Sequence, residues 1–72
     1  ESLFAEITVF SALHKTLHYR IPTELHSAVK PGVRVIAPLG RRESLGLILQ
    51  LDNHPPPLEE NITLRPVRGI VD

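Results

Sequence analysis

The four histidines are the residues of this sequence with the most varied chemistry open to them. His14 and His18 stand four positions apart, the spacing that places two imidazoles on one face of a helix. A zinc site needs three or four ligands, and only His26, His54 and scattered carboxylates remain in a chain without cysteine. Because no helical pattern surrounds the first pair, we expect no metal site.

Serines and glycines give no sign of an enzyme. Ser11, Ser27 and Ser44 lack the sharp strand-to-helix turn that exposes a nucleophilic hydroxyl. Gly40 and Gly46 are too isolated to cradle a phosphate as a glycine-rich loop does. The 72 residues also fall below the roughly 100–200 of a typical catalytic domain. We therefore expect a single binding module without a cofactor, held together by packing alone.

Charge is balanced overall but unevenly distributed. The stretch 14–46 carries six basic and two acidic residues, whereas 47–60 carries three acidic residues and no lysine or arginine. Such a distribution steers an anion to one face or simply forms a solvated surface, and both interpretations stay open. The longest apolar stretch, Leu45–Leu49, is far shorter than the roughly 20 residues of a membrane span, so we expect no membrane segment.

The first half of the chain predicts two strands and one short helical turn. Ala5–Phe10 is rich in β-branched residues, with Ile7 and Val9 on one side and Glu6, Thr8 and Phe10 on the other. The remaining elements are a loop over Ser11–His18, a strand over His18–Ile21 that stops at Pro22, and one helical turn over Thr23–Val29.

The second half predicts a hairpin between two turns. Lys30–Val33 contains the Pro-Gly pair of a type II turn, and Gly46 indicates a β-bulge or a close backbone approach. The elements are a strand over Arg34–Ala37 ended by Pro38, a hairpin connection over Leu39–Glu43, a strand over Ser44–Leu51, an exposed loop over Asp52–Asn61, and a last strand over Ile62–Val71 with Pro66 on an edge. We expect a mostly β, barrel-like rolled sheet of about five to six short strands.

Three segments carry a family resemblance: Leu-His-Lys-Thr-Leu-His-Tyr-Arg-Ile-Pro at 13–22, Pro-Gly-Val-Arg-Val-Ile-Ala-Pro-Leu-Gly-Arg-Arg at 31–42, and Leu-Gly-Leu-Ile-Leu at 45–49. Their order and spacing resemble the N-terminal 3′ DNA-binding domain of the PriA family of replication restart helicases. The positions that match are Leu13, Lys15, Thr16, Tyr19, Pro22, Gly32, Arg34, Val35, Pro38, Gly40, Arg42 and Gly46.

The resemblance implies a non-enzymatic module, residues 1–72, that belongs to a larger bacterial cytoplasmic helicase. It would recognise the 3′-terminal nucleotide of the nascent leading strand at stalled forks and support primosome assembly. Its partners would be DNA with a 3′-hydroxyl terminus, the remaining helicase domains, and single-stranded DNA-binding protein with other primosome proteins. ATP and zinc would belong only to the helicase portion.

The resemblance also implies a base pocket, carried over by position. Its residues here would be Leu17, His18, Tyr19, Gly40 and Arg65, with Arg41 and Arg42 as candidate phosphate contacts. Leu17 and His18 replace a family Phe-Asp pair. Leucine lacks the π-face that makes base stacking worth roughly 1–3 kcal/mol, and histidine adds a donor and a titration near neutrality.

Simpler interpretations stay open for these residues. Tyr19 can be a core residue that closes the barrel, Gly40 can serve turn geometry alone, and Arg41 and Arg42 can be solvated at a hairpin tip. For the whole domain, the alternative is an SH3-like module that binds protein or structured RNA without preference for a strand end.

Overall fold

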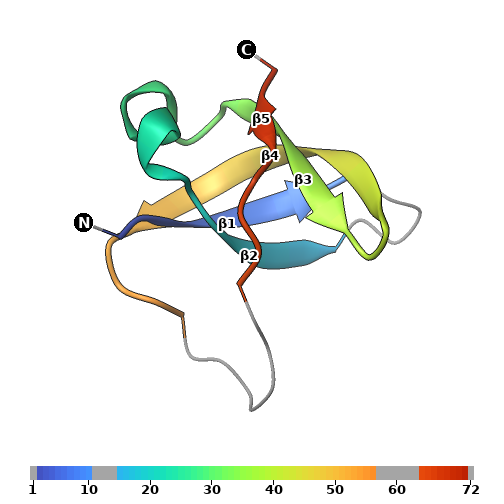
Figure 1. Ribbon diagram of the computed structural model, residues 1–72, viewed down its shortest axis with the longest axis horizontal. Coiled ribbons are helices and arrows are strands. Elements are labelled where there is room, and N and C mark those ends of the chain that lie inside the picture. The colour runs from blue at the N-terminus through green and yellow to red at the C-terminus, as the bar shows by residue number, and fades with distance from the viewer. Residues whose placement is uncertain (1, 11–14, 57–63, 72) are drawn as a thin grey trace.

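The computed structural model describes residues 2–10, 15–56 and 64–71. They form one antiparallel sheet of five strands and one short 3-10 helix (Figure 1). The elements are β1 (Phe4–Val9), β2 (Thr16–Arg20), η1 (Thr23–Ala28), β3 (Arg34–Leu39), β4 (Arg42–Asp52) and β5 (Gly69–Ile70). The strand order in the sheet is β2-β1-β4-β3-β5. The predicted mostly β fold with a single helical turn is confirmed.

β4 rolls the sheet because its two halves have different neighbours. Residues 42–47 of β4 pair with β3, and residues 46–52 pair with β1. Leu49 is an extra residue in the second ladder, since Glu6 pairs with Gln50 while Ile7 pairs with Ile48. A bulge of this kind bends a strand and increases its twist.

The segment 65–71 almost completes the roll by crossing from β2 to β3 (Figure 1). The Arg20 amide donates to the Arg65 carbonyl and the Val67 amide to the Arg20 carbonyl, each at 3.0 Å. One residue later, the Arg68 amide donates to the Ile36 carbonyl on β3 at 2.7 Å. The expectation of a strand over Ile62–Val71 was therefore wrong in length: only Gly69–Ile70 stays beside one neighbour, and 62–63 lie outside the described residues.

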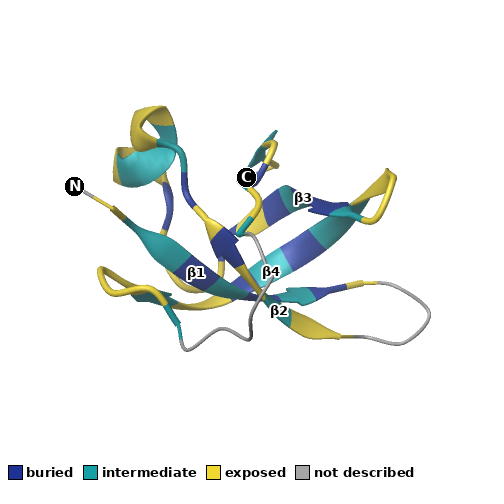
Figure 2. Ribbon diagram, turned by 60° about the horizontal axis from the view of Figure 1, so that its bottom comes forward, coloured by how far each residue is buried: buried dark blue, intermediate teal, exposed yellow. Residues whose placement is uncertain are grey.

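The core lies inside the roll and is built from aliphatic side chains and Tyr19. Figure 2 shows the buried positions as dark blue bands along the strands. In β1, Ala5, Ile7 and Val9 are buried while Phe4, Glu6 and Thr8 are less so, which confirms the predicted alternation. The other members of the hydrophobic core cluster among the described residues are Tyr19, Ile21, Val29, Val33, Val35, Ala37, Ile48 and Val67.

Two glycines provide the turns on either side of β3. Gly32 has φ 96°, and the Val33 amide donates to the Lys30 carbonyl at 3.1 Å, as expected for the predicted type II turn. Gly40 has φ 62° at the first central position of the β3–β4 hairpin, whose last strand pair is Leu39 with Arg42. A hairpin of this length favours a glycine there.

The expectation that Pro38 ends its strand was wrong, because β3 runs through Pro38 to Leu39. The carbonyls of Arg34 and Ile36 accept hydrogen bonds from the backbone amides of Val71 and Arg68. The even-numbered residues of β3 therefore direct their backbone groups away from β4. Pro38 occupies one of these positions. Its missing N–H therefore removes no hydrogen bond between β3 and β4.

Two other predicted boundaries also differ from the structure. β2 begins at Thr16 rather than His18, so the predicted loop Ser11–His18 is shorter; its first four residues lie outside the described residues. The predicted loop Asp52–Asn61 begins after β4, residues 53–55 are exposed as expected, and 57–61 are likewise not described.

Of the two alternatives that the sequence indicated for Gly46, a β-bulge or a close backbone approach, the structure has the close approach. The bulge of β4 lies at Leu49. Gly46 pairs with Val9 on one side and Val35 on the other. A Cβ atom there would lie 2.6 Å from Ile7 Cγ2 and 3.2 Å from the Thr8 carbonyl oxygen. Because Ile7 is fully buried, its methyl group has no free space into which to move.

We expect Gly46→Ala to lower the free energy of unfolding by about 1–3 kcal/mol, through overpacking where β1, β3 and β4 meet. Urea unfolding followed by far-UV circular dichroism measures this change. Gly69→Ala is the matched control, because a Cβ at Gly69 meets nothing within 4 Å. Equal stability of the two variants would contradict the close approach.

Candidate nucleic-acid interface

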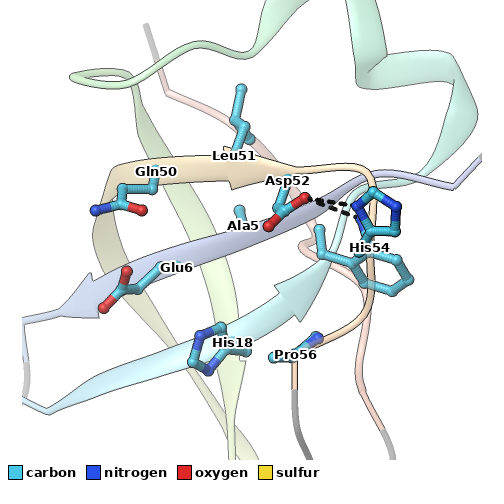
Figure 3. Close-up of a pocket in the computed structure, with 9 residues that line it drawn as sticks. Ala5, Glu6, His18, Gln50, Leu51, Asp52, His54 and Pro56 are labelled. Atoms are coloured by element: carbon cyan, nitrogen blue, oxygen red, sulfur yellow. Dashed lines mark hydrogen bonds and ion pairs between the residues drawn. The ribbon is translucent and has the colours of Figure 1, made fainter.

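β2 divides the predicted site residues between the two faces of the sheet. Leu17 and Tyr19 point inward, where Leu17 is half-buried against the core and Tyr19 is only 3% exposed. His18, between them, is exposed on the outer face beside Glu6 (Figure 3). The alternation of a strand therefore separates the side chains of the Leu17-His18 pair.

Tyr19 joins β2 to the end of β3 through the interior. Its hydroxyl donates to the Pro38 carbonyl at 2.7 Å. Burial raises the pKa of the phenol, and the positive charge of Arg65 partly opposes this rise. With its ring in the core, Tyr19 presents no face to a base and acts as a positioning residue.

Arg65 makes a second connection to the same end of β3. Its guanidinium donates from Nη1 to the Gly40 carbonyl at 2.6 Å. The Arg65 carbonyl meanwhile accepts from the Arg20 amide, which fixes the arginine backbone against β2. Three of the predicted residues, Tyr19, Gly40 and Arg65, thus lie together although they are far apart in sequence.

The outer edge of β2 has an open position at His18. The Lys15 carbonyl accepts from the Val9 amide, and the Ile21 amide donates to the Leu3 carbonyl. The backbone groups of the odd-numbered residues along β2 therefore bond to β1. Even-numbered residues face the other edge, where the backbone of Arg20 bonds to the segment 65–67. Among the described residues no backbone partner meets the N–H and C=O of His18 there. We call this open backbone, together with Gly40 and Arg65, the edge site.

Three basic residues lie at the β3–β4 hairpin and just before β2. Arg41 and Arg42 are exposed at the β3–β4 hairpin. Lys15 is exposed just before β2, and Figure 1 shows the start of β2 at the same end of the sheet as that hairpin. Glu43 is the acidic residue of the hairpin, and it is paired with Arg68 at 3.3 Å. This end of the molecule therefore attracts anions.

A cavity of about 170 Å³ lies on the outer face of the sheet (Figure 3). His18, Glu6 and Gln50 stand side by side in it on β2, β1 and β4, because Glu6 pairs with both of the others. Asp52 and His54 complete one side. The His54 amide donates to Asp52 Oδ1 at 3.0 Å, and this bond, with a weaker one from the imidazole, lowers the pKa of the Asp52 carboxyl.

Comparison with known proteins identifies the family. The sequence model of the PriA 3′ DNA-binding domain (3′BD) matches residues 6–72. The chain belongs to this family. No curated protein sequence matches it. The domain is thus a DNA-binding domain of the 3′BD family, and DNA is its partner.

For this 3′BD domain, the motif positions named His18, Gly40 and Arg65, which the structure brings to one end of β2 and β3. They did not name Glu6 or Gln50, which line the cavity with His18. Strand alternation in the sequence already placed Glu6 on the face opposite Ile7. Which residues of β2 and β4 stand beside Glu6 depends on strand register, for which the sequence has no direct signal.

In the described part of the 3′BD chain, no three residues among His, Asp and Glu are grouped so that they could hold a metal ion. No helix in that part is long and apolar enough to cross a membrane.

The titration of Tyr19 tests the contacts inside the domain. Tyr19 is the only tyrosine and tryptophan is absent, so phenolate absorbance reports on this ring alone. We expect a midpoint above the ordinary 10.0, and a further rise in Arg65→Gln, which removes the opposing charge. Because the pKa of Tyr19 is higher in the folded state than in the unfolded chain, the neutral phenol stabilises the folded state. This contribution is full below about pH 10 and is lost as pH rises through the folded pKa. A lower midpoint in Arg65→Gln would contradict this geometry.

Proposed function

We propose that the domain holds the 3′-terminal nucleotide of a DNA strand at the edge site. The observation that carries the proposal is that no backbone group of the described residues pairs with His18 at the edge of β2, near which Arg65 is held against Gly40. A free N–H and C=O at a strand edge offer one donor and one acceptor in fixed positions. A nucleotide presents both kinds of group through its base edge and its 3′-hydroxyl.

Arg65 would supply the charged contact. One of its five N–H donors is used on Gly40, which fixes the guanidinium plane and leaves other donors for a phosphate or a base. Gly40 has no side chain, and the space where a Cβ would lie is open to a nucleotide because no described atom lies within 4 Å of it. Arg41 and Arg42 would contact phosphates further along the strand and carry no sequence information.

Leu17 would give a weaker base contact than the family phenylalanine. It is half-buried against the core, so part of its surface remains for packing on a base. The loss of stacking, roughly 1–3 kcal/mol per base, is offset in this proposal by the backbone of His18 and by Arg65. Base identity would then matter less than the presence of a terminus.

End recognition of this kind suits a module of a replication restart helicase. A free 3′ terminus marks the nascent leading strand at a stalled fork, and binding it would place the helicase and the primosome there. The motor domains would add further DNA contacts, so the affinity of the isolated domain would understate that of the whole protein. Family membership favours DNA over the alternative of a protein-binding or RNA-binding module.

Fluorescence anisotropy tests the preference for a terminus. We expect an oligonucleotide ending in a 3′-hydroxyl to bind about tenfold more tightly than one ending in a 3′-phosphate, because the phosphate ester removes the O–H donor and puts a bulkier group in its place. Arg65→Gln should reduce the affinity for the hydroxyl end by about tenfold, since it removes charge-assisted hydrogen bonds.

Lys30→Gln is the matched control, since Lys30 is an exposed cation in the turn before β3 and lies outside the edge site. Its loss should leave end discrimination unchanged at two salt concentrations. Equal affinity of the wild-type domain for both termini would remove the proposal, whereas a steep salt dependence alone would report only phosphate contacts.

The side chain of His18 has its own test. His18→Ala keeps the backbone N–H and C=O, so most of the end affinity should remain. We expect the affinity of His18→Ala for the hydroxyl end to fall by less than about threefold, because the imidazole points into the cavity on the outer face and not toward the edge site. A loss of about tenfold or more would show that the imidazole, and not the backbone, holds the terminus.

A further inference from the structure

The cavity on the outer face has the opposite electrostatic character to the edge site. Glu6 and Asp52 contribute carboxylates to its wall, and none of the described residues that line it is a lysine or an arginine. Arg20 shares a row with Phe4 and Asp52 on this face but does not line the cavity. The cavity therefore repels the phosphates that the basic hairpin attracts.

The acceptors of the cavity form one row. Glu6 stands between His18 and Gln50 on adjacent strands, so its two carboxylate oxygens, the Gln50 amide oxygen and the His18 imidazole lie across the same surface (Figure 3). Neighbouring strands are about 4.8 Å apart, so the row spans about 10 Å. Such a row matches a flat group that carries several N–H donors in fixed directions.

Asp52 adds a second carboxylate that stays charged. The amide and imidazole of His54 bond to its Oδ1 at 3.0 and 3.4 Å and lower its pKa. The carboxylate is exposed, so an incoming donor can reach it from the cavity. The cavity also has an apolar wall that includes Phe4, whose aromatic ring suits a cation.

We infer that this cavity receives an arginine side chain from the surface of a protein partner. Its volume of about 170 Å³ accommodates one side chain and not a folded segment. The guanidinium provides five N–H donors in a plane, bonds to a carboxylate through two of them, and stacks on aromatic rings. A lysine ammonium would satisfy the charge but would use fewer acceptors of the row. A nucleotide would bring its phosphate toward Glu6 and Asp52.

DNA and a protein would then occupy different faces of one strand. The backbone of His18 faces the edge site, while its imidazole lines the cavity. Only this residue is shared between the two sites. The protein contact goes beyond the proposed DNA function and does not require it.

Amide shift mapping on the 72-residue chain tests the inference. The probe is the peptide acetyl-Gly-Arg-Gly-amide, with the lysine peptide and the neutral citrulline peptide for comparison. We expect saturable shifts at Glu6, His18, Gln50 and Asp52 with the arginine peptide, weaker binding of lysine and no binding of citrulline. Equal shifts with citrulline would overturn the inference, as would shifts confined to residues outside the cavity.

Variants separate the cavity from the edge site. Glu6→Gln should lower the affinity of the domain for the arginine peptide by about fivefold to tenfold, since it removes the central charge of the row. Glu24→Gln, an exposed acid on η1 outside the cavity, should leave peptide affinity unchanged. Gln50→Lys should abolish peptide binding, because the new ammonium would pair with Glu6 across the strands.

Both cavity variants should keep wild-type affinity for a 3′-hydroxyl oligonucleotide. Retained peptide affinity in Glu6→Gln would overturn the inference. A loss of oligonucleotide affinity in both variants, with no response to the peptide, would instead assign the cavity to DNA.

Discussion

The hydrogen bond from the Tyr19 hydroxyl to the Pro38 carbonyl is the constraint on which the candidate interface depends. It joins β2 to the end of β3, two strands that are not neighbours in the sheet. The phenol is buried, so water does not compete for the bond. Pro38 is free to accept it because its backbone faces away from β4. This bond and the Arg65 bridge together hold Gly40 near the edge of β2.

Two other features act with this bond. Gly46 allows β1, β3 and β4 to approach closely, and the extra residue Leu49 bends β4, so the sheet rolls far enough for Tyr19 to reach Pro38. Arg65 then bridges the segment after the proline-rich loop to Gly40. Each of these contacts joins distant parts of the chain, and together they produce an open strand edge next to a fixed cation.

The sequence predicted local features well. The alternation around Ile7 and Val9, the Pro-Gly turn at Lys30–Val33 and the glycine at position 40 are each determined within a few residues. It could not predict contacts such as Tyr19 with Pro38 or Arg65 with Gly40, which span 19 and 25 residues. Pro38 was misjudged because a proline interrupts a ladder only on the edge its nitrogen faces, and that edge is fixed by register. The row of Glu6, His18 and Gln50 depends on register in the same way.

The replacement of a family Phe-Asp pair by Leu17 and His18 changes the balance of contacts rather than the scaffold. The two side chains lie on opposite faces, so the substitutions act separately: one alters apolar packing, and the other alters an outer face that already carries Glu6. The backbone at position 18 is unaffected by either change. The edge site therefore rests on groups that these substitutions leave in place.

Amide hydrogen exchange at His18 tests the edge site most directly. In the free domain the His18 amide should exchange fast, because no backbone carbonyl of the described residues accepts from it, whereas the Leu17 amide should be protected by its bond to β1. Saturation with a 3′-hydroxyl oligonucleotide should slow exchange at His18, and a 3′-phosphate oligonucleotide should not. A His18 amide that is already protected in the free domain, or that exchanges at the same rate when DNA is bound, would contradict the account.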